Sequence, residues 1–124
     1  MTDSVQTLGN MLSHDSSVSA DLRATLVAIA ESAQALARTI ASGPLGTRLD
    51  KHVGENSDGD AQKLLDVLAD ELFADALSAA PVRWYASEER SEIDLLNAGG
   101  SLAVAIDPLD GSSNIDANIS IGTI

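Results

Sequence analysis

Two aspartates, Asp107 and Asp110, follow an apolar segment and lie three residues apart. Pro108 between them fixes the backbone φ angle and forces a turn, so both carboxylates can come round to the same side. The turn can also leave the carbonyl oxygen of Leu109 exposed as a further oxygen ligand. Because hard cations such as Mg²⁺ prefer oxygen ligands, this stretch indicates a divalent-cation site.

Small polar residues follow the second aspartate directly. Gly111 lets the backbone approach a ligand closely, because it has no side chain. Ser112, Ser113 and Asn114 are suited to open a short helix, whose first backbone N–H groups would bind a phosphate. Cation-binding carboxylates and a phosphate site would therefore lie within one short segment.

Two further acidic clusters stand at the edges of expected elements. Asp60 and Asp66 lie near the start of an expected helix, and Glu88 and Glu89 follow an expected strand. In α/β sheets, ligand sites usually lie at the carboxyl ends of the strands. Carboxylates gathered from separate segments suit a site of two or three metal ions, which would hold the attacking and leaving oxygens of a phosphoryl transfer.

Each cluster also has an ordinary structural interpretation. Asp-Pro and Asp-Gly are common turn dipeptides. Asp60 would be a helix N-cap, Asp66 a solvent-facing helix residue, and 88–89 a solvated pair. Trp84 and Tyr85 are expected in the core rather than in a ligand site. The order of all the clusters along the chain, taken jointly, favours the functional interpretation.

Two helices are expected ahead of most of these residues. Residues 1–19 are polar and predict a mobile tail, with one short amphipathic turn at 7–12 as the alternative. Apolar residues three or four apart then predict a helix with Ser19 as its N-cap and Gly43 at its end. A second helix, over about 61–79, has a broad apolar stripe, so we expect it to pack on more than one neighbour.

Strands are expected at 82–86 and 102–106. The second is a continuous apolar run, which is typical of a strand buried on both faces. Another apolar stretch begins at Ile119 and would pair with a segment further along the chain. The order of these elements predicts an α/β fold in which helices pack on a mixed sheet.

Composition bounds the class of protein. The 124 residues, 44% of them hydrophobic, suffice for one domain. With 19 acidic and 7 basic residues the formal charge is -12, which disfavours nucleic acid and anionic membranes as partners but allows phosphate binding through divalent cations. The absence of cysteine excludes disulfides and thiolate metal sites. With no signal peptide and no membrane-spanning stretch in the sequence, a cytoplasmic location is expected.

The motifs resemble those of class 1 fructose-1,6-bisphosphatases. DPLDGSSNID at 107–116 is close to a signature of that family, and SIGTI at 120–124 continues it. GDAQKLLDVLADELF at 59–73 and SEE at 87–89 occur at the expected spacing. The resemblance implies a layered αβαβα sugar-phosphatase fold, of which residues 20–124 form the N-terminal part and the C-terminal half is missing, in a homotetramer.

The resemblance also implies a role for each candidate residue. The metal ligands would be Glu88, Asp107, the Leu109 carbonyl, Asp110 and Asp60. The water-activating pair would be Glu89 and Asp66. The contacts to the substrate's 1-phosphate would be Asp110, Gly111, Ser112 and Ser113. The implied reaction is hydrolysis of fructose 1,6-bisphosphate to fructose 6-phosphate and phosphate with two or more Mg²⁺ per subunit, in gluconeogenesis or the Calvin cycle.

Other functions stay open at this point. A sedoheptulose-1,7-bisphosphatase or an inositol-monophosphatase-like phosphatase would use similar clusters. A non-catalytic module that binds divalent cations, or a purely structural domain with acidic caps, would need no substrate site. Because the family carries its sugar contacts in a part that follows these motifs, residues 1–124 are expected to be an inactive fragment of an active enzyme.

Overall fold

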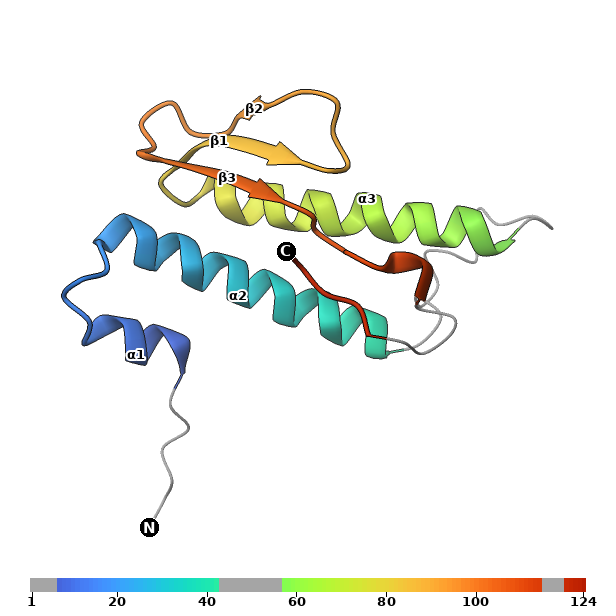
Figure 1. Ribbon diagram of the computed structural model, residues 1–124, viewed down its shortest axis with the longest axis horizontal. Helices are drawn as coiled ribbons and strands as arrows, with labels where there is room; N and C mark the ends of the chain where they lie inside the picture. The colour runs from blue at the N-terminus through green and yellow to red at the C-terminus, as the bar shows by residue number, and fades with distance from the viewer. Residues whose placement is uncertain (1–6, 43–56, 115–119) are drawn as a thin grey trace, which may run out of the picture.

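The structure, a computed structural model, describes residues 7–42, 57–114 and 120–124, and for 57–61 it describes the backbone only. Three helices precede a small sheet (Figure 1). The elements are α1 (Leu8–Ser13), α2 (Ala20–Ala41), α3 (Ser57–Ser78), β1 (Val82–Ser87), β2 (Asp94–Leu95), β3 (Leu102–Ile106) and the 3₁₀ helix η1 (Ser112–Asn114). None of the helices in these ranges combines the length and hydrophobicity needed to cross a membrane.

The two N-terminal helices begin at capping residues. The backbone N–H of Leu22 donates to Ser19 Oγ over 3.1 Å, which confirms Ser19 as the N-cap of α2. Thr7 caps α1 in the same way, so the segment expected as a mobile tail contains a helix packed against α2. The structure thus favours the alternative of a short amphipathic turn there, while the domain boundary at 19/20 stays a prediction.

Helix α3 begins at Ser57, earlier than the expected start near 61. Asp60 therefore lies within the first turn of the helix, and its interpretation as an N-cap is wrong. Gly59 also lies in this first turn, where a glycine costs about 1 kcal/mol, and packing of the following apolar residues outweighs that cost. Contacts with both α2 and β1 confirm that α3 packs on more than one neighbour.

The strands form a mixed sheet in the order β2-β1-β3. β1 pairs in parallel with β3, with Tyr85 opposite Val104, and antiparallel with β2, with Trp84 opposite Leu95. The two expected strands and the mixed sheet are confirmed. β2 was not predicted, because its two residues lie in a polar connection that shows no alternating pattern.

The sheet is less deeply buried than the sequence indicated. Ala103 and Ala105 are exposed whereas Ile106 is buried, so the expectation that β3 is buried on both faces is wrong. The reason is that α3 packs on the sheet from one side (Figure 1). Neighbouring residues of a strand point to opposite faces, and accordingly Tyr85 is fully buried while Trp84 is 43% exposed, which corrects its assignment to the core.

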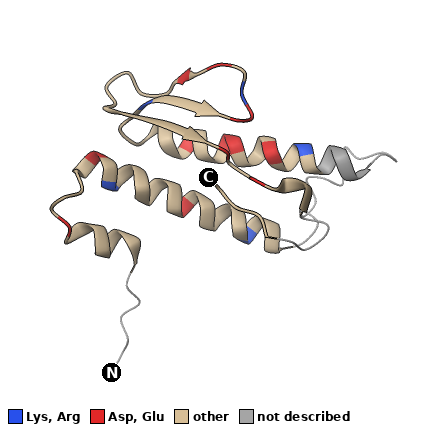
Figure 2. Ribbon diagram, viewed as in Figure 1, with Lys and Arg blue, Asp and Glu red and all other residues tan. Residues whose placement is uncertain are grey.

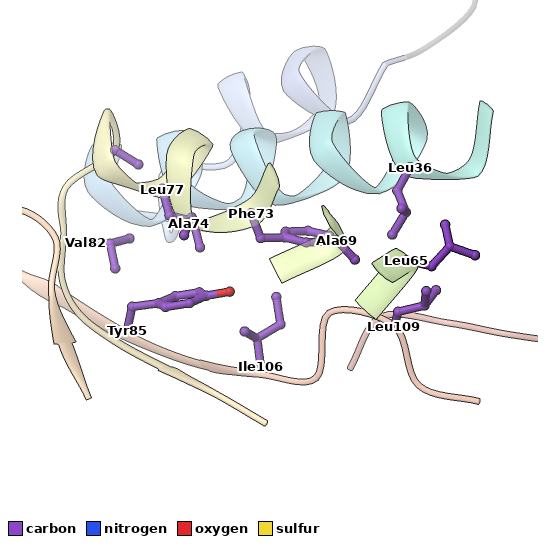
Figure 3. Close-up of a cluster of buried hydrophobic side chains, with 11 residues drawn as sticks. Leu36, Leu65, Ala69, Phe73, Ala74, Leu77, Val82, Tyr85, Ile106 and Leu109 are labelled. Atoms are coloured by element: carbon purple, nitrogen blue, oxygen red, sulfur yellow. The ribbon is translucent and has the colours of Figure 1, made fainter. Parts of the chain in front are cut away.

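The hydrophobic core lies between the helices and the sheet (Figure 3). It combines Leu36 of α2, Phe73 and Leu77 of α3, and Tyr85 of β1. The turn after β3 also contributes, because Leu109 is only 5% exposed and its side chain points into this cluster (Figure 3). The core therefore supports the segment that carries the candidate ligands.

Candidate functional site

The carboxyl ends of β1 and β3 bring two of the acidic clusters to one edge of the sheet. Ser87 pairs with Ile106, and the backbone N–H of Glu88 donates to the Ile106 carbonyl over 3.0 Å. Glu88 therefore lies directly beside the end of β3, where Asp107 follows. Figure 2 shows acidic positions on the turn after β1, on the segment after β3 and on α3. The expected meeting of acidic residues at the strand ends is confirmed.

Asp66 of α3 completes this group. It is half-buried, and its Oδ1 atom is buried without a hydrogen-bond partner among the described residues. The interpretation of Asp66 as a solvent-facing helix residue is therefore wrong. An unsatisfied buried acceptor costs about 1–3 kcal/mol, which a bound cation or a hydrogen-bond donor would offset.

Glu89 has a raised pKa, and the cause identifies its neighbours. Although the residue is exposed, its carboxyl group is partly shielded from water, and this desolvation is the main reason why the pKa of Glu89 is raised. The nearby carboxylates of Asp66, Glu88 and Asp107 raise it further. These four side chains thus form one cluster in which negative charge is crowded, which we call the carboxylate cluster.

A turn follows β3, as the sequence predicts, and hydrogen bonds hold it in place. The backbone N–H of Leu109 donates to Asp107 Oδ1 over 3.1 Å, so this aspartate also stabilises its own turn. Asp110 exchanges two backbone hydrogen bonds with Gly122, of 2.8 and 3.1 Å. The apolar stretch expected to pair further along the chain thus pairs back onto this turn in the described residues.

The small polar residues after Asp110 also adopt the expected local structure. Gly111 has a φ angle of +78°, which favours glycine, and η1 follows directly. The short helix predicted to open at Ser112 is confirmed. Ser112 Oγ accepts a hydrogen bond of 3.1 Å from Gln62 Nε2, whereas Ser113 is exposed. Gln62 was not predicted, although it lies one helical turn before Asp66, on the same side of α3.

The acidic residues lie near one another but do not form a metal-binding group. Within 7–42, 62–114 and 120–124, no three acidic or histidine side chains lie close enough together to hold a metal ion. Asp110 is exposed and belongs to the turn rather than to the carboxylate cluster. The side chain of Asp60 lies outside the described residues.

A protein-family model matches almost the whole chain, including the carboxylate cluster and the turn after β3. Residues 6–124 match the model described as fructose-1-6-bisphosphatase, N-terminal domain. The chain belongs to the fructose-1,6-bisphosphatase family. The matched range includes the stretches at Asp107–Asp116 and Ser87–Glu89 that resemble this family.

Relatives and solved structures agree with the family. A class 1 fructose-1,6-bisphosphatase of Bradyrhizobium sp. is 62% identical over 124 residues, which are 100% of this chain and 37% of the relative. That of Paracoccus denitrificans is 55% identical over 83% of this chain and 30% of the relative. The crystal structure of the Leishmania major fructose-1,6-bisphosphatase in holo form has a TM-score of 0.71 and 29% sequence identity to this chain. The match covers 95% of this chain and 36% of that one. The chain thus spans about a third of the length of the curated relatives it matches.

This bisphosphatase family segment also contains an ionic network beside the carboxylate cluster. Arg90 Nε lies 2.6 Å from Asp70 Oδ2, and Arg90 Nη1 lies 2.5 Å from Asp94 Oδ2. The Tyr85 hydroxyl donates to Asp70 Oδ1 over 2.9 Å. The sequence analysis missed this network, although Asp70 follows Asp66 by one helical turn and Arg90 directly follows Glu89.

Proposed function

We propose that this chain is part of a Mg²⁺-dependent fructose-1,6-bisphosphatase, which hydrolyses the 1-phosphate of fructose 1,6-bisphosphate to fructose 6-phosphate and phosphate. The observation that carries the proposal is the carboxylate cluster at the ends of two parallel strands, in a chain that belongs to this family. A turn with a positive-φ glycine follows one of those strands.

The donor chemistry of the site fits Mg²⁺. The unpartnered Oδ1 of Asp66 and the crowding of carboxylates around Glu89 both favour a cation nearby. In the proposed enzyme two or more Mg²⁺ would be held by Glu88, Asp107, the Leu109 carbonyl, Asp110 and Asp60. When bound, the cations would offset the charge of the phosphate and of the leaving oxygen.

Glu89 would accept the proton of the attacking water. A carboxylate with a raised pKa is a stronger base at neutral pH than an unperturbed one, and the pKa of Glu89 is raised by partial burial and by its acidic neighbours. Asp66 faces the same cluster with a free oxygen and would hold the water beside Glu89. The two residues come from α3 and from the turn after β1, so the fold itself keeps them together.

The turn at 110–113 would bind the 1-phosphate. Gly111 takes a backbone conformation that favours glycine, which would let the backbone of this turn approach the phosphate closely. Gln62 orients the hydroxyl of Ser112, and Asp110 and Ser113 are exposed at the same turn. These groups would contact the phosphate and the oxygens next to it.

The same proposal includes an assembly and a location. We infer a homotetramer in the cytoplasm that serves gluconeogenesis or the Calvin cycle, supported by the family and by the similarity to class 1 enzymes. Light scattering of the purified full-length enzyme tests the assembly, since a tetramer has four times the mass of one chain. A stable monomer or dimer that is fully active would contradict this part.

Phosphate release by the purified full-length enzyme tests the function. We expect Mg²⁺-dependent hydrolysis of fructose 1,6-bisphosphate, faster than that of sedoheptulose 1,7-bisphosphate or inositol monophosphate. Glu89→Gln should lower kcat by about 10²–10⁴-fold, the range expected for general-base catalysis. The matched control is Glu92→Gln, which neutralises an exposed carboxylate three residues away and should leave kcat unchanged. Equal activity of the two variants would contradict the proposed role.

A further inference from the structure

Arg90 joins three elements around the carboxylate cluster. Its guanidinium reaches Asp70 of α3 with Nε and Asp94 of β2 with Nη1. It also lies 5.2 Å from the centre of the Tyr85 ring of β1. Because Arg90 directly follows Glu89, one side chain connects the segment after β1 to the helix that carries Asp66.

The partner on α3 is fixed from two sides. Asp70 is 5% exposed, with one oxygen bound to the Tyr85 hydroxyl and the other to Arg90. It therefore differs from Asp66, one turn earlier on α3, whose buried Oδ1 has no partner among the described residues. The Asp70 carboxylate, which has two partners, anchors Arg90. The Asp66 carboxylate faces the carboxylate cluster.

Charge balance indicates that Arg90 acts through its position. Its positive charge lies against two carboxylates, those of Asp70 and Asp94, so the network as a whole carries no excess positive charge. It does not neutralise the carboxylate cluster. The planar guanidinium instead holds two carboxylates in a defined geometry, which a flexible ammonium group does less well.

Backbone hydrogen bonds transmit this anchoring to the glutamates. The N–H of Arg90 donates to the Ser87 carbonyl over 3.1 Å, and the N–H of Glu89 donates to Ser87 Oγ over 3.2 Å. The N–H of Glu88 is held by the Ile106 carbonyl. The two glutamates thus lie in a tight turn that is fastened to β3 at its start and, through the Arg90 side chain, to α3 at its end.

We propose that Arg90 is a positioning residue which, through Asp70, holds the Glu88–Glu89 turn against α3 and so keeps Glu89 beside Asp66. This inference rests on the proposed function and extends it to residues outside the catalytic and metal-binding set. It gives a role to Asp70, a buried aspartate on α3 that lies outside the proposed catalytic and metal-binding set. Hydrogen-bond partners that orient metal-site residues typically matter by about 10–100-fold in metal affinity or activity.

The test compares Arg90→Gln, Asp70→Asn and the double variant with the wild-type full-length enzyme. Steady-state kinetics give kcat and KM, and calorimetric titration of the metal-free enzyme with Mg²⁺ gives the affinity for the metal alone. We expect kcat and Mg²⁺ affinity to fall about 10–100-fold in each single variant, with KM unchanged. The double variant should be no worse than the more affected single one, because both break the same contact.

Two control variants separate positioning from loss of stability. Arg83→Gln removes an exposed arginine of β1, which lies over Trp84 rather than in the network, and should change nothing. Val82→Ala leaves a cavity at the far end of β1, where the side chain is fully buried, and should lower Tm without changing Mg²⁺ affinity. Arg90→Lys should recover stability more than Mg²⁺ affinity, because it keeps the charge and loses the two-sided geometry.

Specific results would overturn the inference. If folded Arg90→Gln binds Mg²⁺ and turns over like the wild type, Arg90 has no positioning role. The same conclusion follows if Val82→Ala weakens Mg²⁺ binding as much as Arg90→Gln does, since the effect is then one of stability. A wild-type enzyme without activity refutes the proposed function instead, and the calorimetric comparison still decides whether Arg90 organises the cation site.

Discussion

Gly111→Ala tests whether the turn after β3 must keep its backbone conformation. The φ angle of Gly111 is +78°, and a residue with a Cβ atom pays about 1–2 kcal/mol for such a left-handed conformation. A Cβ added there would also lie 3.1 Å from Asn114 Nδ2, a contact that the flexible side chain can relieve by moving. If the turn shifts to escape this strain, the proposed phosphate contacts shift with it. Since each 1.36 kcal/mol is tenfold in rate, kcat/KM should fall about 5–30-fold.

Gly122→Ala is the matched control for this experiment. Gly122 pairs with Asp110 through its backbone N–H and carbonyl, which alanine retains, and no atom of the described residues lies within 4 Å of an added Cβ. Its kcat/KM for fructose 1,6-bisphosphate should stay within about twofold of the wild type, as for surface changes of under about 0.5 kcal/mol. Both variants are assayed in the full-length enzyme at saturating Mg²⁺. Equal kcat/KM values for the two variants would refute the reasoning that the positive φ angle positions the phosphate contacts.

Three further predictions concern stability, each measured as the midpoint of urea unfolding. In the metal-free protein the pKa of Glu89 is raised, so the folded state binds more protons at this residue than the unfolded state does. The free energy of unfolding should therefore fall as pH rises from the ordinary glutamate pKa of 4.5 through the raised pKa. Glu89→Gln should remove that fall, and a pH dependence identical to the wild type would contradict this. Tyr85→Phe removes the hydroxyl bound to buried Asp70 and should cost about 1.5–3 kcal/mol, whereas an unchanged midpoint would show that the hydrogen bond contributes nothing net. Gly100→Ala places a Cβ atom 2.6 Å from a backbone nitrogen of β1 and should cost about 1–3 kcal/mol, while the control Gly99→Ala, whose nearest atom is a side-chain oxygen at 3.5 Å, should be close to neutral.

Features governed by local interactions could be predicted from the sequence. The N-cap at Ser19, the ends of β1 and β3 and the short helix at Ser112 all depend on residues within a few positions of one another. The meeting of Glu88 with Asp107 followed from the general geometry of strand ends in α/β sheets. These features carry most of the candidate site.

Features that depend on distant partners could not be predicted. Whether Trp84 is buried depends on which face of the sheet the helices cover, which the strand itself does not encode. Asp70 and Arg90 are twenty positions apart in the chain, and their contact exists because β1 packs on α3. The start of α3 was predicted too late in the chain. Gly59 and two neighbouring aspartates do not favour a helix locally, whereas the packing of the residues that follow does.

Leu109 serves two purposes that are usually assigned to different residues. Its side chain fills part of the core, whereas its carbonyl belongs to the turn that is proposed to bind metal. Protein interiors are packed as densely as crystals, so a smaller side chain at this position leaves a cavity or draws the neighbouring atoms inwards. The substitutions that this turn can accept are therefore limited by core packing as well as by its proposed chemistry. We expect a substitution as mild as leucine to valine at 109 to displace the proposed metal-binding carbonyl by way of the core.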